Sequence, residues 1–295
     1  MKPKIDLKDP KVITIKKHIE NETVLALEAE QTVESAIIPV YAIPKVKAHQ
    51  KPKSKFEQVG SGVLVNIDTE YFLFTATHVA LEFLDHGLAI GWGVGEPIRQ
   101  YKTERFSWGR QEKPLENFLD ASVFHIQEDL PSHLRTLAIT VDDMDFSPYG
   151  SVSSVFTVSG FRVRKSNTSG NSVFSRREAF ASVEYNKDIY DRLKISYDTH
   201  IVLAFEKQIL VADYWQEAPL IRGMSGGALI RAMGTNVDFT KKPNKYRSVR
   251  QLLTGIVIEQ HPSKNNLPAY ILGTRIEVFL ELVTKYLPSL EEKIW

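Results

Sequence analysis

Short β-like segments follow one another through most of this chain, and they limit its fold more than any other feature. "VGSGVLVNI" and "YFLFTAT", joined by the polar "DTE", read as a β-hairpin. Later runs such as "ASVFHI", "SVSSVFTVSGFRV", "QLLTGIVIEQ" and "AYILGTR" are also rich in β-branched and aromatic residues, and Gly, Pro, Asn and Asp separate them. About a dozen such segments are too many for one small barrel. We therefore expect an all-β protein of two packed antiparallel β-barrels or sandwiches.

One segment near the end of the chain is a clear exception to this β pattern. In "RIEVFLELVTKYL" the apolar residues Ile276, Phe279, Leu280 and Val283 fall on one face of a helix. At the other end, the chain mixes charges with apolar residues and reads as a short helix or an arm lying on the main body. We expect an N-terminal arm over residues 1–35, a first barrel over 36–145, a second barrel over 146–274, and a C-terminal helix and tail over 275–295.

Composition excludes several classes of function. With 43% hydrophobic and 25% charged residues, the 295-residue chain is of ordinary globular composition. Its 37 Lys and Arg balance 36 Asp and Glu, so no overall field attracts nucleic acid or an anionic membrane, and we expect neither as a partner. No apolar run is long enough to span a bilayer, and no signal peptide is visible, which together predict a cytoplasmic protein. The absence of cysteine excludes disulfides, thiol catalysis and thiolate metal sites.

The stretch "IRGMSGGALI" places three glycines around Ser225. Glycine accepts backbone angles that other residues resist, so the cluster marks a tight turn or a close approach to the main chain. Two interpretations remain open at this point. Either this is a turn between strands, or Ser225 is a nucleophile whose neighbouring N–H groups bind an oxygen atom.

A serine nucleophile needs a histidine base and a carboxylate that orients it. His78 directly follows the apolar run "YFLFTAT", and Asp120 heads the run "ASVFHI", so both stand at strand ends. A rigid strand end holds such groups better than a charged loop does. The other histidines before the serine lie in polar segments or inside strand patterns: His18, His49, His86, His125, His133 and His200.

The order His78, Asp120, Ser225, with "TATH" and "GMSGGAL", resembles the chymotrypsin-fold (trypsin-like) serine peptidases. Because the chain lacks cysteine, it is most similar to the cysteine-free bacterial trypsin-like peptidase domains. The resemblance covers about residues 36–287. It implies two six-stranded β-barrels with the catalytic triad His78, Asp120 and Ser225 in the crevice between them. It further implies an oxyanion hole formed by the backbone N–H groups of Gly223 and Ser225.

The same resemblance indicates where a substrate would bind. Trypsin-like members that prefer Lys or Arg carry an acidic residue six positions before the serine, but Pro219 occupies that position here. The strand "LLTGIVIEQ" resembles the wall of the substrate cleft, which makes Ile258, Glu259 and Gln260 candidate substrate-binding residues together with Pro219. Glu259 either supplies a charge to this cleft or is a solvated glutamate at a strand edge.

These observations predict a serine endopeptidase that cleaves protein or peptide substrates through an acyl-enzyme, without cofactor or metal. Its activity is expected to be latent or restricted to few substrates, under the control of the N-terminal arm or a regulatory protein. Two alternatives stay open. A chymotrypsin-like fold can persist as a catalytically silent binding or scaffold module. Alternatively, Gly223-Met-Ser225-Gly-Gly is the nucleophile elbow of an α/β-hydrolase-type esterase, with His261 as the later histidine.

Overall fold

The structure is a computed structural model of the full chain. It describes Asp6 and the following residue ranges: 8–44, 55–83, 87–91, 97–108, 119–147, 153–163, 167–169, 172–206, 208–211, 214–218, 221, 223–238 and 248–295.

The first half of the chain forms a seven-stranded antiparallel sheet with the strand order β5-β4-β1-β2-β3-β7-β6. Its strands are β1 (Ile37–Ala42), β2 (Glu57–Ile67), β3 (Glu70–Thr75), β4 (Leu88–Ile90), β5 (Arg99–Tyr101), β6 (Thr103–Ser107) and β7 (Ser122–Ile126). The expected hairpin is β2–β3. Its turn contains Asp68 at φ 57°, a left-handed conformation that Asp tolerates better than most residues.

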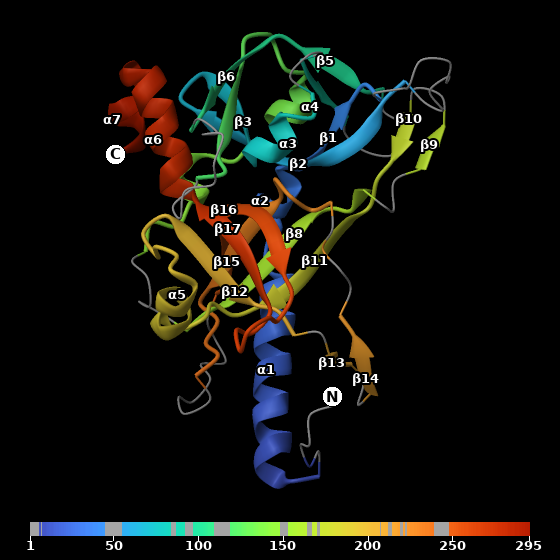
Figure 1. Ribbon diagram of the computed structural model, residues 1–295. Coiled ribbons are helices and arrows are strands. Elements are labelled where there is room, and N and C mark those ends of the chain that lie inside the picture. Colours follow the sequence, from blue (N-terminus) through green and yellow to red (C-terminus); the bar gives the residue numbers. More distant parts are fainter. Residues whose placement is uncertain are drawn as a thin grey trace.

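The second half forms a six-stranded antiparallel sheet with the order β11-β8-β15-β16-β17-β12. Its strands are β8 (Val155–Phe161), β11 (Arg177–Ser182), β12 (His200–Ala204), β15 (Ala228–Met233), β16 (Arg250–His261) and β17 (Tyr270–Arg275). Two separate hairpins extend from it: β9 (Asn167–Ser169) with β10 (Ser172–Phe174), and β13 (Gln208–Val211) with β14 (Tyr214–Glu217). In Figure 1 the two large sheets lie one above the other, with the short helix α3 (Thr77–Ala80) between them.

The two longest helices of the described chain, α1 (Pro10–Glu28) and α6 (Ile276–Tyr286), lie near its two ends, and the other helices are short. Besides α3, these are α2 (Thr32–Ser35), α4 (Ser132–Arg135), α5 (Lys187–Leu193) and α7 (Glu291–Ile294), with 3-10 turns η1 (Val141–Asp143) and η3 (Pro288–Leu290). Helix α6 stands beside the upper sheet in Figure 1, whereas α1 projects below the lower one. None of the helices in the described ranges is both long and apolar enough to cross a bilayer.

The largest hydrophobic core joins both sheets and α6. It contains Phe74 of β3, Ile256 of β16 and the four α6 residues expected on one helix face, Ile276, Phe279, Leu280 and Val283, all of them fully buried. The Phe279 ring stacks on Phe74, with 5.4 Å between the ring centroids. The C-terminal helix therefore packs against the first sheet although it directly follows the last strand of the second.

The expected all-β class is confirmed: two antiparallel sheets carry the fold, and a C-terminal helix covers the core. Two details differ from expectation. Within the described residues the first sheet has seven strands rather than six, and the N-terminal arm contains a 19-residue helix instead of a short one. The Asp9 side chain caps that helix by accepting the N–H of Lys11 at 2.8 Å, and Pro10 occupies its first turn. The boundaries set at residues 35, 145 and 274 stay predictions.

A buried ion pair attaches the segment between the sheets to the second sheet. Arg231 of β15 donates from Nη1 to Asp145 at 3.0 Å and from Nε to Ser154 at 3.2 Å. The side chains of Arg231 and Asp145 are 6% and 2% exposed. The backbone N–H of Asp145 also donates to the carbonyl of Leu253 in β16. Loss of the carboxylate would thus leave a buried guanidinium without its counter-charge.

We expect Asp145→Ala to lower the free energy of unfolding by about 3 to 5 kcal/mol, the usual effect of removing one partner from a buried pair. The matched control is Glu20→Ala, which removes the exposed Lys16–Glu20 pair of α1 and should cost less than about 1 kcal/mol. Urea unfolding followed by tryptophan fluorescence compares the two variants. Equal losses in both would contradict a structural role for the buried pair.

Candidate active site

His78 and Asp120 meet because β3 and β7 are adjacent and in register. Thr75 at the end of β3 pairs with Ser122 at the start of β7, so the residues just beyond these positions lie at the same end of the sheet. His78 lies in α3, and Asp120 lies two residues before the start of β7. The imidazole Nδ1 lies 2.6 Å from Asp120 Oδ2, and the backbone N–H of His78 donates to Asp120 Oδ1 at 3.0 Å.

This pair has the asymmetry that a general base requires. Asp120 is buried, with a side chain 7% exposed, whereas the His78 side chain is 45% exposed. A carboxylate held by two donors fixes the imidazole with its proton on Nδ1, which leaves the lone pair of Nε2 free to accept a proton. The structure therefore brings together the two predicted residues His78 and Asp120.

The glycines around Ser225 serve a tight turn that docks on the first sheet. Gly223 and Gly226 have φ angles of +91° and +81°, in the region that favours glycine. A Cβ atom at Gly226 would overlap the carbonyl oxygen of Ser61 in β2, and one at Gly223 would lie 2.7 Å from the backbone nitrogen of Val163. These glycines thus allow both the turn and its close packing.

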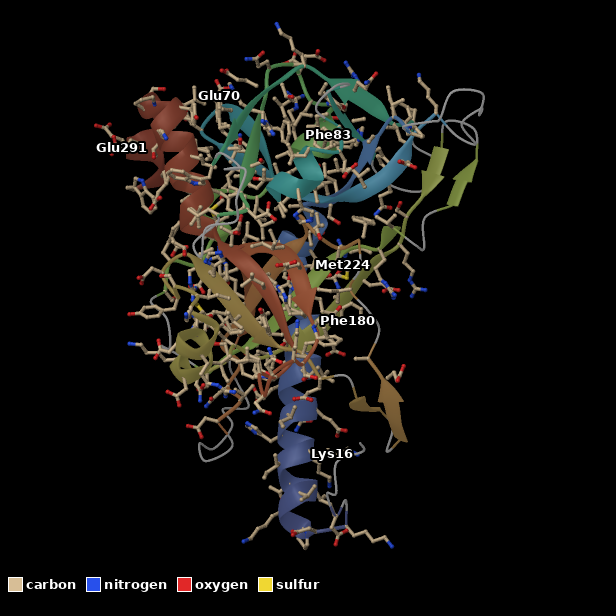
Figure 2. All side chains as sticks on the ribbon, viewed as in Figure 1. Lys16, Glu70, Phe83, Phe180, Met224 and Glu291 are labelled. Carbon is tan, nitrogen blue, oxygen red and sulfur yellow. The ribbon has the colours of Figure 1, made fainter. Side chains whose placement is uncertain are left out.

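A backbone hydrogen bond holds Ser225 against the first sheet. The N–H of Ser61 donates to the carbonyl of Ser225 at 2.9 Å, while the carbonyl of Ser61 accepts the hydroxyl of Thr75 at 2.8 Å. A Cβ atom at Gly60 would lie 2.7 Å from the side chain of Val79 and 2.9 Å from the carbonyl oxygen of Ser225. The backbone of Ser225 therefore lies next to the residue that follows His78. Figure 2 places the preceding residue, Met224, at the junction of the two sheets.

The Ser225 hydroxyl makes its hydrogen bond away from His78 in this structure. It donates to the backbone carbonyl of Ile258 at 2.7 Å. Ile258 lies at an irregularity in the β16–β17 pairing, between Val257 and Glu259. The triad implied by the resemblance requires the Ser225 hydroxyl to reach His78, but no hydrogen bond between these two described residues is present here.

Gly223 and Ser225, the two predicted oxyanion donors, differ from their neighbours in the hydrogen bonding of their backbone N–H groups. Met224 donates to the carbonyl of Ile221, Gly226 to that of Val257, and Gly227 to that of Met224. Within the described ranges, no backbone carbonyl accepts the N–H of Gly223 or of Ser225. Two N–H groups beside the hydroxyl thus remain available to an anionic oxygen.

The predicted substrate-binding residues lie beside this loop, with one exception. Pro219 lies outside the described residues. Ile258 accepts the Ser225 hydroxyl, and the Gln260 side-chain oxygen accepts the N–H of Ile221 at 3.0 Å. The pKa of Glu259 lies below its ordinary value, chiefly because of its hydrogen bond with His261, and the positive charge that His78 can carry acts in the same direction.

Histidine–carboxylate contacts alone do not define a site. His125 lies 2.6 Å from Glu70 and His261 lies 2.7 Å from Glu259, so the described residues contain more than one such pair. Among the histidines of the described ranges, only His78 combines a buried carboxylate with a neighbouring serine loop. No group of three or more His, Asp or Glu residues in the described part of the chain is arranged to hold a metal ion.

Sequence analysis missed Ser61 and Thr75, which attach the serine loop to the first sheet. A usable signal was present, because Gly60 and Gly62 interrupt a strand pattern in "VGSGV". Glycine inside a strand often marks a place where another backbone approaches closely.

The fold and the site can now be compared with known proteins. Neither protein-family models nor curated protein sequences match this chain. The two antiparallel sheets with this junction define the fold of a trypsin-like serine protease. Among solved structures, the chain is similar to neuropsin, a serine protease expressed in the limbic system of mouse brain. The TM-score is 0.51 at 14% identity, over 88% of this chain and 97% of the neuropsin chain.

We expect Gly226→Ala to destabilise the protein more than Gly87→Ala, by about 2 kcal/mol or more. Both glycines have a positive φ, so both substitutions carry the same backbone strain. At Gly87 the nearest atom of the described residues to an added Cβ is the Tyr101 carbonyl oxygen at 3.8 Å, whereas at Gly226 the Ser61 backbone occupies the space. Urea unfolding measures the difference. Similar midpoints for the two variants would mean that the serine loop is not docked on β2 as described.

Proposed function

We propose that this chain is a serine endopeptidase that cleaves protein or peptide substrates, with Ser225 as nucleophile, His78 as general base and Asp120 as the group that orients it. The observation that carries the proposal is the 2.6 Å contact between His78 Nδ1 and the buried Asp120, at the junction where Ser61 holds the Ser225 loop. The fold shared with a trypsin-like serine protease supports it.

The proposed reaction begins when the Ser225 hydroxyl turns from Ile258 towards His78. Ser225 Oγ attacks the substrate carbonyl carbon while His78 Nε2 takes its proton, and Asp120 stabilises the resulting imidazolium. The N–H groups of Gly223 and Ser225 stabilise the negative oxygen, a contribution of about 3 to 4 kcal/mol per donor. The imidazolium then protonates the leaving amine as the C–N bond breaks. Water, deprotonated by His78, hydrolyses the acyl-enzyme.

The orientation of Ser225 supports a latent resting state. A hydroxyl–carbonyl hydrogen bond contributes only about 1 kcal/mol net, so a bound substrate or partner could reverse it at little cost. We propose that a regulatory protein or the N-terminal arm controls this step. Helix α1 of the arm is anchored to the second half of the chain through Glu22, which accepts the backbone N–H of Asn236 at 2.7 Å. The balanced charge and the lack of cysteine support a cytoplasmic site of action.

The same hydroxyl orientation favours a second candidate function, a catalytically silent binding module with this fold. The esterase alternative has less support. Ser225 is followed by the strand β15, not by the helix that a nucleophile elbow requires.

We expect a fluorophosphonate probe to label the wild-type protein and not Ser225→Ala, because only an activated serine reacts with it at a useful rate. Gel fluorescence after short incubation detects the label. Ser147→Ala is a control, because this serine lies outside the proposed machinery and its loss should leave labelling unchanged. If the folded wild-type protein stays unlabelled alone and with candidate partners, the binding-module function is correct instead.

Asp120→Asn tests the role of the carboxylate separately from that of the serine. An asparagine at this position favours the wrong imidazole tautomer, so kcat on a cleaved peptide should fall by about 10⁴-fold while the fold stays intact. Steady-state kinetics on an internally quenched peptide, with circular dichroism as the folding control, provides the measurement. A loss of less than tenfold would remove Asp120 from the mechanism.

A further inference from the structure

In the described part of the chain, the end of β16 has an unpaired edge beside the candidate nucleophile. Strand β15 pairs with β16 only as far as the Ala228–Ile256 position, while β17 continues to pair with residues 259–261 on the other side. No strand in the described part of the chain pairs with residues 259–261 on the side opposite β17. An extended peptide can add to such an edge through its backbone. Because Ile258 touches the Ser225 hydroxyl, a peptide here would pass close to the reacting bond.

Glu259 stands on this edge with a carboxylate that is already oriented. Its Oε1 lies 2.7 Å from His261 Nε2, and the His261 ring stacks on Tyr270 with 4.5 Å between centroids. The Glu259 side chain is 54% exposed. Its second oxygen has no hydrogen-bond partner among the described residues, and no Lys or Arg of those residues pairs with it.

Among the described residues, the charges around Glu259 make this part of the site negative. Within those residues, the groups that interact with Glu259 are the side chains of His261, His78, Asp120 and Tyr270, of which only the two histidines can become positive. Neutral His78 is the form that a general base requires, and Asp120 then adds a second negative charge close by. A cation in the peptide is therefore attracted to the free oxygen of Glu259.

We propose that Glu259, oriented by His261, selects substrates that carry Arg or Lys among the residues preceding the cleaved bond. This inference rests on the proposed function, and it makes Glu259 a specificity residue and His261 a positioning residue. It explains how the site can favour a basic side chain although Pro219 replaces the acidic residue that trypsin-like members use. Arginine is the better probe of the two, because its guanidinium stays charged at every working pH and donates in several directions to the one free oxygen.

The test compares internally quenched peptides that differ only by Arg or its neutral isostere citrulline, placed in turn at each of the four positions before the cleaved bond. At one position the wild type should prefer Arg by about tenfold in kcat/KM, mainly through KM, as expected for one charge-assisted hydrogen bond. Glu259→Gln should abolish this preference and Glu259→Lys should reverse it towards a Glu-containing peptide. His261→Phe keeps the aromatic stack and should give an intermediate ratio.

The control Glu292→Gln removes an exposed carboxylate of α7 and should keep the tenfold ratio. A preference that persists in Glu259→Gln, or a wild-type ratio near one at every position, overturns the inference and leaves the proposed function standing.

A binding experiment separates the two proposals. Fluorescence anisotropy measures the affinity of the same peptides for Ser225→Ala, with and without Glu259→Gln. Selective binding of the Arg peptide that depends on Glu259, combined with an unlabelled and inactive wild type, shows that Glu259 recognises Arg but rejects peptidase activity and with it a role in substrate cleavage. If the protein shows neither cleavage nor Arg-selective binding, both proposals are rejected.

Discussion

One backbone hydrogen bond, from the Ser61 N–H in β2 to the Ser225 carbonyl, underlies the whole candidate site. The two sheets come from different halves of the chain, so a catalytic set shared between them requires a rigid joint. Ser61 forms this joint with all of its polar groups. Besides its N–H, its carbonyl accepts the Thr75 hydroxyl and its own hydroxyl accepts the N–H of Phe161 in β8 at 2.9 Å. Ser61 is fully buried. Water therefore cannot compete for these bonds, and the joint stays in place as long as the two sheets remain packed.

The elements that local pattern determines could be predicted from the sequence. Residue spacing predicts both the β2–β3 hairpin, from its alternating and apolar runs, and helix α6, from its one apolar face. In these elements burial follows directly from spacing. Helix α1 could not be predicted to its full length. Its inward face carries His18 and Glu22, whose partner is the backbone of Asn236 more than 200 residues away, and these polar residues break the apolar period. A contact between residues so far apart in sequence produces no local sequence pattern from which the helix could be predicted.

The same distinction applies within the candidate site. His78 and Asp120 could be predicted because strand ends hold side chains rigidly, and the β3–β7 register then brings them into contact. The Ser225 hydroxyl is different, because its direction depends on a torsion with alternatives separated by about 1 kcal/mol. The irregularity in β16 that presents the Ile258 carbonyl decides that torsion here. Such a local choice depends on three-dimensional packing and cannot be deduced from residue order.

The three histidine–carboxylate pairs of the described residues make similar contacts but differ in how deeply the carboxylate is buried. His125 and Glu70 face each other on β3 and β7 with the carboxylate 43% exposed, so water screens the pair. Glu259 is also exposed, and its hydrogen bond with His261 orients it. Asp120 alone is buried behind an exposed ring. The 2.6 Å contact with Nδ1 holds the exposed His78 ring against this buried carboxylate. Burial of the carboxylate is therefore the feature that distinguishes this pair from the other two.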